Sequence, residues 1–222
     1  MRHLYFLLLL VGCAGVPTPV GPSTPVEPSG FTAVAYNGLS SLNLDPPGTA
    51  MFLFRETCDI DFHTSISPVG SDGLITVQNN QSLYRYYQTY HDVLVWGTKI
   101  EVLWDNRSQT PIKGNLLIVD DSLLRSINSV ATIPASDALT ALEKLFLAAD
   151  DAASYDIAEP MLVYYFCSTT HRWHYGWESM VIAHHPGYDP HTSALSDVNL
   201  VYFIIIDGIS GEQLLLEFEL KN

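Results

Sequence analysis

Five histidines lie close together in the last third of the sequence, where their imidazole groups could bind a metal ion. They are His171, His174, His184, His185 and His191. Imidazole and carboxylate ligands suit zinc, copper or nickel, and Asp189 stands in the same stretch. The spacing matches no dedicated zinc motif, and Pro186, Gly187 and Pro190 predict a loop around the last three histidines. A transition-metal site for zinc or copper is therefore an alternative, and the leading expectation is that the protein has no cofactor.

Catalytic motifs are missing from the sequence. It contains no H-E-x-x-H, G-x-S-x-G, P-loop or G-x-G-x-x-G pattern, and neither Cys58 nor Cys167 has the local signature of a nucleophile. The paired acids Asp120–Asp121 and Asp150–Asp151 have the character of loop or helix-end charges. We predict that the protein is not an enzyme.

The first residues have the character of an export signal. Met1–His3 is a short basic start, and the apolar run Leu4–Val11 is too short to span a membrane but fits a secretory signal. It ends in L-V-G-C at Cys13, which resembles a bacterial lipoprotein signal with cleavage before a cysteine that then carries lipid. The alternative is an ordinary signal peptide with a chance cysteine. By the same resemblance, Ala14 favours the outer over the inner membrane, and leaves exposure to the periplasm or the exterior open.

The next segment and the cysteine count agree with export to the cell envelope. Five prolines between Val16 and Gly30 favour an extended stalk. With Cys13 acylated, Cys58 and Cys167 remain, and an oxidising compartment favours a disulfide between them. The alternative is two buried free cysteines.

Composition excludes several classes of protein. The chain has 222 residues, of which 47% are hydrophobic and 11% aromatic, so global disorder is excluded. The net charge of -14 disfavours nucleic acid as a partner, because an acidic surface repels phosphates. Beyond residue 13 no run approaches the roughly 20 apolar residues of a membrane-spanning helix.

Short apolar runs separated by turn residues predict a body rich in strands. The predicted strands are Met51–Arg55, Leu74–Val77, Ser82–Tyr90, Val93–Trp104, Asn115–Val119, Met161–Cys167, Trp173–Ala183, Leu200–Ile206 and Gln213–Phe218. After Pro134, apolar residues recur at helical spacing from Ala138 to Ala149 and predict one helix of about 15 residues. The expected fold class is α+β, with antiparallel sheets and one long helix packed on a sheet face.

Two stretches of the sequence resemble parts of a known family. Residues 83–104 hold an R-Y-x-Q strand, a turn and a V-x-G-x-x-x-x-V strand, carried by Arg85, Tyr86, Gln88, Tyr90, Val95, Gly97 and Val102. This pattern resembles the fungalysin/thermolysin propeptide, and I-K-G-N-L at 112–116 resembles its next strand. In the C-terminal part, the start of the predicted helix at 133–139, L-V-Y at 162–164, the strand at 177–182 and the hairpin at 202–215 resemble a PepSY domain. The resemblance implies a cystatin-like or PepSY-like half at the C-terminus.

The resemblance also divides the chain and implies a function. The predicted regions are a signal peptide (1–12), a lipidated cysteine and linker (13–30), an unassigned segment (31–69), a propeptide-like region (70–128) and a PepSY-like region (129–222). A free-standing module of this kind is expected to bind a protein partner, and the family implies a secreted thermolysin-like metalloprotease that it inhibits or helps to fold. The tail would then lie along the protease cleft, with the contact residues Leu214, Leu216, Glu217, Phe218 and Glu219. The alternatives are a general structural or ligand-binding envelope lipoprotein and a metal-binding lipoprotein.

Overall fold

The structure is a computed structural model of the whole chain, and it describes residues 30–58, 63–127, 129–150, 152, 154–185 and 198–221. The predicted signal peptide, Cys13 and all but the last residue of the predicted linker lie outside these residues. No helix among the described residues is both long enough and apolar enough to cross a membrane.

The N-terminal half contains seven described strands, one 3-10 turn and one α-helix. They are β1 (Phe31–Asn37), the 3-10 turn η1 (Leu39–Ser41), α1 (Pro46–Thr57), β2 (Thr64–Pro68), β3 (Leu74–Gln78), β4 (Gln81–Tyr90), β5 (Val93–Val95), β6 (Lys99–Asp105) and β7 (Thr110–Val119). The short helix α2 (Asp121–Leu124) leads to the C-terminal half. That half contains α3 (Ala135–Ala149), β8 (Ser154–Ile157), β9 (Met161–Cys167), β10 (Arg172–His185), β11 (Val198–Asp207) and β12 (Gln213–Lys221).

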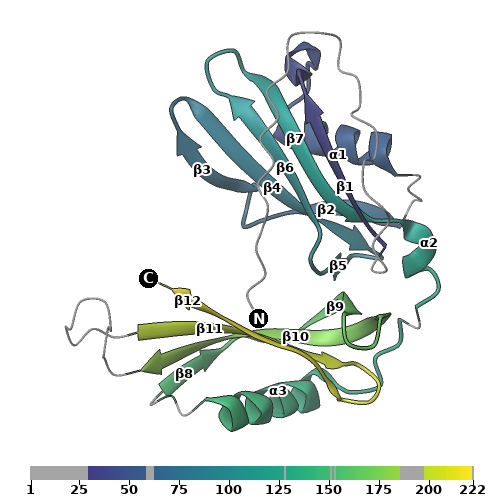
Figure 1. Cartoon of the computed structure of the whole chain (residues 1–222), viewed down its shortest axis with the longest axis vertical. Coiled ribbons are helices and arrows are strands. Elements are labelled where there is room, and N and C mark those ends of the chain that lie inside the picture. Colours follow the sequence, from purple (N-terminus) through teal and green to yellow (C-terminus); the bar gives the residue numbers. More distant parts are fainter. Residues whose placement is uncertain are drawn as a thin grey trace.

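All twelve described strands join into one mixed sheet (Figure 1). Its order is β1-β7-β6-β4-β5-β9-β10-β11-β12, with β2 and β3 on β4 and β8 on β10. The two halves meet where β5 pairs with β9 in parallel, through Leu94↔Val163 and Val95↔Tyr164. The predicted α+β fold class with separate antiparallel sheets and one long helix is therefore wrong. Alternating polarity predicts strands well, but it carries no information on a pairing between residues so far apart in sequence.

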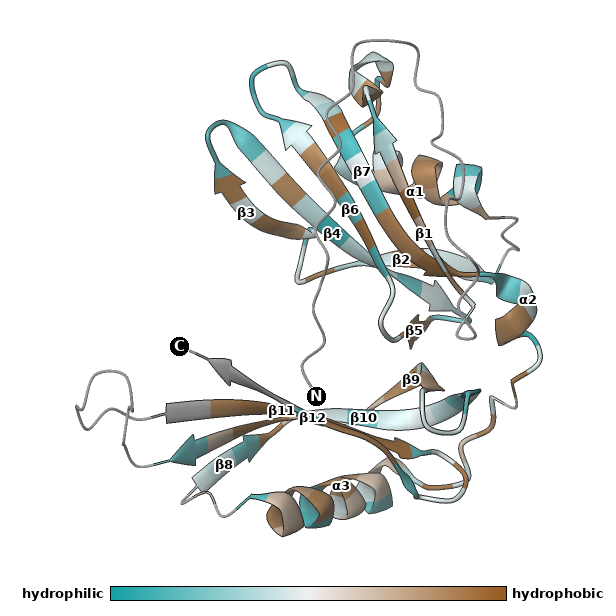
Figure 2. Cartoon of the chain, in the orientation of Figure 1, coloured by the Kyte–Doolittle hydropathy of each residue, from teal (hydrophilic) through white to brown (hydrophobic). Residues whose placement is uncertain are grey.

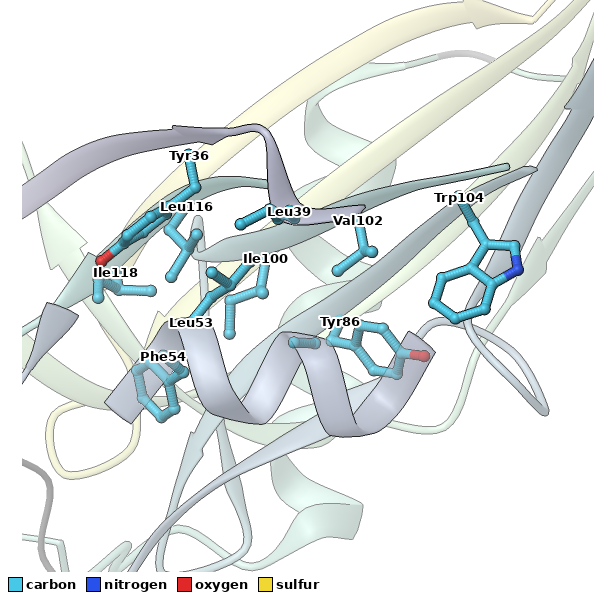
Figure 3. Close-up of a cluster of buried hydrophobic side chains, with 11 residues drawn as sticks. Tyr36, Leu39, Leu53, Phe54, Tyr86, Ile100, Val102, Trp104, Leu116 and Ile118 are labelled. Atoms are coloured by element: carbon cyan, nitrogen blue, oxygen red, sulfur yellow. The ribbon is translucent and has the colours of Figure 1, made fainter. Parts of the chain in front are cut away.

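The N-terminal half has its own helix, where the sequence predicted a strand at Met51–Arg55. Asp45 caps the helix by accepting a hydrogen bond from the Gly48 amide at 2.8 Å, and prolines occupy its first turn. The helix buries Ala50, Leu53 and Phe54, whose spacing of three and one puts them on one face. This face packs on β6 and β7 in a core drawn in Figure 3. The apolar run is too short for its period to distinguish a helix from a strand.

Residues 31–69 are part of the same body as the region that follows. β1 pairs with β7 over its whole length, from Phe31↔Val119 to Asn37↔Lys113, and β2 pairs with β4. In β6, the even-numbered residues Ile100, Val102 and Trp104 are buried, as the alternating pattern predicts. Bands of alternating hydropathy along β4, β6 and β7 are visible in Figure 2.

The C-terminal half contains the helix that the sequence predicts. In α3, Ala138, Leu142 and Phe146 are fully buried at intervals of four residues. They pack on apolar side chains of β10 and β11 that include Val181 and Ile204. Figure 1 shows α3 lying along one face of this part of the sheet.

A third apolar cluster fills the junction between the halves. Tyr90 and Val119 from the N-terminal half meet Tyr164 and Tyr175 from the C-terminal half, together with Leu124 of α2. The rings of Tyr90 and Tyr164 lie 5.8 Å apart at 65°. The junction is therefore packed as well as hydrogen-bonded.

Candidate functional site

The C-terminal half has two unequal sheet faces. Side chains alternate along a strand, so Trp177, Val181 and Ala183 of β10 face α3, and the even-numbered residues of β10 face the other way. We call this other side of β8–β12 the far face. By strand register it carries Tyr165, Met161, His174, Glu178, Met180, Phe203, Ile205, Asp207, Leu215 and Glu217.

No described helix covers the far face. Helix α1 packs in the N-terminal half, and α2 and α3 pack on the side of the sheet opposite the far face. The loop after β5 covers one end, where Trp96 stands at 75° to Tyr165 with ring centroids 5.4 Å apart. The other part is open: Met161 is 51% exposed and Met180 38%.

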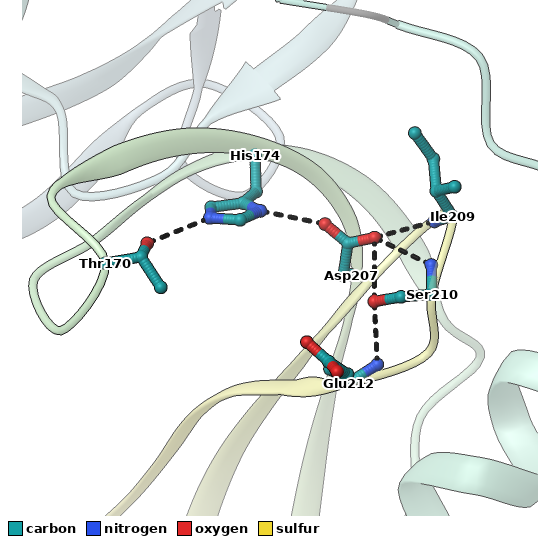
Figure 4. Close-up of polar contacts among 6 residues, drawn as sticks. All are labelled: Thr170, His174, Asp207, Ile209, Ser210 and Glu212. Carbon is teal, nitrogen blue, oxygen red and sulfur yellow. Dashed lines mark hydrogen bonds and ion pairs between the residues drawn. The ribbon is translucent and has the colours of Figure 1, made fainter.

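A chain of polar contacts lies at one end of the far face (Figure 4). His174 Nδ1 lies 2.8 Å from Asp207 Oδ2, and His174 Nε2 lies 3.1 Å from Thr170 Oγ1. The other carboxylate oxygen, Asp207 Oδ1, accepts hydrogen bonds from the amides of Ile209 and Ser210 at 2.9 and 2.8 Å. Sequence reasoning placed Asp207 at the end of a strand but gave it no role.

These polar contacts stabilise the turn between β11 and β12. Burial by itself raises the pKa of Asp207, but the hydrogen bonds from Ser210, His174 and Ile209 outweigh burial and hold the pKa below its usual value. The Asp207 carboxylate is therefore charged, and both of its oxygens have polar partners. The order hydroxyl–imidazole–carboxylate is that of a hydrolytic triad, but Thr170 sits in a solvent-exposed hairpin turn and Asp207 is held by the turn amides of Ile209 and Ser210. These contacts join the turn after β9 to the turn after β11.

The structure separates the histidines that the sequence predicted as a metal site. His171 is exposed in the turn, and the neighbours His184 and His185 point to opposite faces of β10. His184 pairs with Asp156 at 3.1 Å, and His185 Nε2 lies 3.0 Å from Asp150 Oδ1. Asp150 also accepts a hydrogen bond from the hydroxyl of Tyr202. Within the described residues no three His, Cys, Asp or Glu side chains could hold a metal together, and His191 lies outside those residues.

The predicted disulfide is not formed in this structure, because Cys58 and Cys167 are both free. Cys58 follows α1 and packs on the N-terminal core, whereas Cys167 ends β9 in a far-face cluster. Burial, and then the charges of Asp120 and Asp121, raise the pKa of Cys58 to about 12. For Cys167, burial raises the pKa, but hydrogen bonds from Thr170 and Thr169 outweigh burial and lower it.

The predicted tail residues form a regular edge strand. β12 pairs with β11 from Ile206↔Gln213 to Asn199↔Lys221, and no described strand pairs with its outer edge. Leu216 packs toward α3, Leu214 packs with the cluster that contains Ile205, and Glu217 is exposed. The side chains of Phe218 and Glu219 lie outside the described residues.

The residue that sequence reasoning missed altogether is Glu178. It is 8% exposed in the middle of β10, with Met161 and Ile205 directly beside it on the neighbouring strands. No hydrogen bond or ion pair to it is found among the described residues, and burial raises its pKa above the usual 4.5. The carboxylate oxygens are not among the fully buried polar atoms that lack a partner, so the group reaches the surface of the far face. Partly desolvated carboxyls of this kind concentrate at functional sites. Nothing in the sequence around Glu178 distinguishes it from the other polar residues of a strand.

The propeptide-like motif residues of the N-terminal half have structural roles. The side chain of the buried Gln88 donates to the carbonyl of Val119 at 2.8 Å and accepts from its amide at 2.9 Å. Arg85 pairs with Glu101 across β4 and β6 at 2.6 Å. Gly97 has a φ of 84°, a conformation that favours glycine.

No protein-family model matches the chain, and no curated protein matches it either. The resemblance to metalloprotease propeptides and PepSY domains therefore remains a prediction from the sequence motifs.

Proposed function

We propose that this chain is a non-enzymatic protein-binding module that engages its partner through the far face and the free edge of β12. The observation that carries the proposal is the far face itself. It combines exposed methionines, a half-buried Phe203 and two acidic residues, Glu178 and Glu217, that no described side chain neutralises by an ion pair. Apolar surface beside polar groups is typical of protein interfaces.

The edge of β12 supports the same proposal. The strand is nine residues long, and every second residue directs its amide and carbonyl outward, where a further strand could pair with them. Adding a strand to a sheet edge is a common mode of peptide recognition. Glu217 and Lys221 lie on this strand, and such charges discourage unselective pairing of edges. A complementary partner would satisfy both the edge and its charges.

For the partner, the sequence motifs favour a secreted thermolysin-like metalloprotease that the module inhibits or helps to fold. The Cys13 motif would hold the module on a bacterial membrane by a lipid anchor. The regular pairing of β12 with β11 favours contact through the strand's outer edge over a free tail lying in the protease cleft.

The test mixes the purified chain with a thermolysin-like metalloprotease. Cleavage rate and recovery of active protease after dilution from denaturant are both measured. Met180→Asp puts a charge on the exposed far face, and Leu147→Asp makes the same type of change on α3, where Leu147 is 54% exposed.

We expect the parent chain and Leu147→Asp to lower the rate or raise the recovery at micromolar concentration, and Met180→Asp to need about 10-fold more protein. Unchanged rate and recovery with the parent chain would contradict a protease partner. Equal activity of the two variants would contradict binding through the far face.

A further inference from the structure

The negative charge of the chain is concentrated in its C-terminal half. Residues 129–222 contain three Lys or Arg and thirteen Asp or Glu, a net charge of -10, whereas residues 1–128 contain seven and eleven, a net charge of -4. A surface of one sign attracts partners of the opposite sign and speeds their association. The half with the uncovered face is therefore the half that attracts cations.

Two acidic residues of the far face already have partners. Asp207 is held by His174 and the turn amides, and Asp156 is paired with His184. Glu178 differs from both, because it has the greater burial and no described donor within hydrogen-bonding distance.

The surroundings of Glu178 fit the end of a cationic side chain. Ile205 lies directly across from it, and Met180 follows two residues later on the same face, so apolar groups flank the carboxyl. Trp96 and Tyr165 belong to the same apolar cluster as Ile205. Methylene groups of a lysine or arginine would pack on such surface while the charged end reaches the carboxylate.

We propose that Glu178 is the receptor for a lysine or arginine side chain of the partner protein that docks on the far face. This inference rests on the proposed function and specifies the chemistry of the partner. An ion pair formed there excludes water and restores the interactions that burial removes from the carboxylate. Glu217 of β12 lies beside Phe203 of β11 on the same face and offers the partner a second carboxylate.

The test uses the full chain and a fluorescent peptide of alternating threonine and lysine, about ten residues long to match a strand such as β12. Binding is followed by fluorescence anisotropy in low salt and in physiological salt. Glu178→Gln removes the charge and keeps the shape. The control Glu159→Gln makes the same change at an exposed loop position of the same half. A peptide with glutamate in place of lysine controls for charge.

We expect Glu178→Gln to weaken binding by about 10-fold or more and Glu159→Gln by less than about twofold. The glutamate peptide should not bind. Equal effects of the two substitutions, no binding by the parent chain, or undiminished binding by Glu178→Gln would each overturn the proposal. If Glu178→Gln still changed the protease cleavage rate or recovery as the parent chain does, the proposed function would hold and only the cation site would be refuted.

Discussion

Two buried polar side chains, one in each half of the sheet, are held in different ways. In the N-terminal half, Gln88 is fully buried, and its amide group makes two hydrogen bonds to Val119. In the C-terminal half, Glu178 is almost as buried and makes none that the structure describes. A buried group whose hydrogen bonds are satisfied stabilises a fold, whereas a largely desolvated carboxylate without a hydrogen bond costs stability. Gln88 is therefore a structural residue, whereas Glu178 is the residue to which the proposed function gives a role in binding.

The largest expected effect comes from Gln88→Leu. The leucine fills the volume but leaves the amide and carbonyl of Val119 without their partner, so the free energy of unfolding should fall by about 2–4 kcal/mol. Chemical denaturation of the full chain measures it. Gln81→Leu, at the exposed start of the same strand, is the control and should change stability by less than about 0.5 kcal/mol. Equal effects would break the comparison, because Gln88 would then not be a structural residue.

An intermediate effect is expected from Asp207→Ala, the satisfied acid of the far face. Loss of its bonds to His174 and the turn amides should cost about 1–3 kcal/mol. Because its pKa is lowered in the folded state, its contribution is present above the ordinary value of 3.8 and is lost as pH falls through the lower folded pKa. The variant should therefore lose less stability than the parent on acidification.

Asp72→Ala is the control for this experiment. Asp72 also accepts a turn amide, from Leu74 at 3.0 Å, but it lies in an exposed turn of the N-terminal half. We expect denaturation curves at several pH values to shift less for this variant. A larger shift for Asp72→Ala would show that the His174 contact adds nothing.

The smallest effect, and one of opposite sign, is expected from Glu178→Gln. Removing a desolvated charge should raise the free energy of unfolding at neutral pH by about 0.5–1 kcal/mol. Because the folded pKa is raised, the parent is relieved of this cost below the unfolded value of 4.5 and loses stability as pH rises through the folded pKa. The advantage of the variant should therefore disappear in acid, as thermal unfolding at a series of pH values would show. A variant less stable than the parent at neutral pH would mean that Glu178 has a structural partner.

Local pattern predicted those parts of the fold in which the elements are long and periodic. The stripe from Ala138 to Phe146 predicts α3, and the alternation around Ile100–Trp104 predicts β6. The apolar run Met51–Arg55 predicts a strand, because five residues do not show a helical period. In the structure, Asp45 and the two prolines after it start a helix there. The pairing of Leu94 with Val163 joins two segments that are far apart in the sequence, and the local pattern of neither segment predicts it.

The sequence predicts the candidate site less well than it predicts the fold. Clustered histidines suggested a metal, but alternation along β10 sends His184 and His185 to opposite faces. The setting of Glu178 depends on the neighbouring strands β9 and β11, which the sequence does not place beside it. No described residue of these strands donates a hydrogen bond to its carboxylate. A resemblance carried by motifs identified Gln88 and Arg85, whose roles are structural.

The parallel joint between β5 and β9 also sets an order of assembly. Its two residue pairs close a loop of about seventy residues, and such long closures are entropically costly and slow. The hairpins β6–β7, β9–β10 and β11–β12 connect neighbours in sequence and need no such closure. We therefore expect each half to collapse around its own helix first and the joint to close last. Until it closes, the end of β9 is an unprotected edge, so the folding chain passes through a stage that is prone to aggregation.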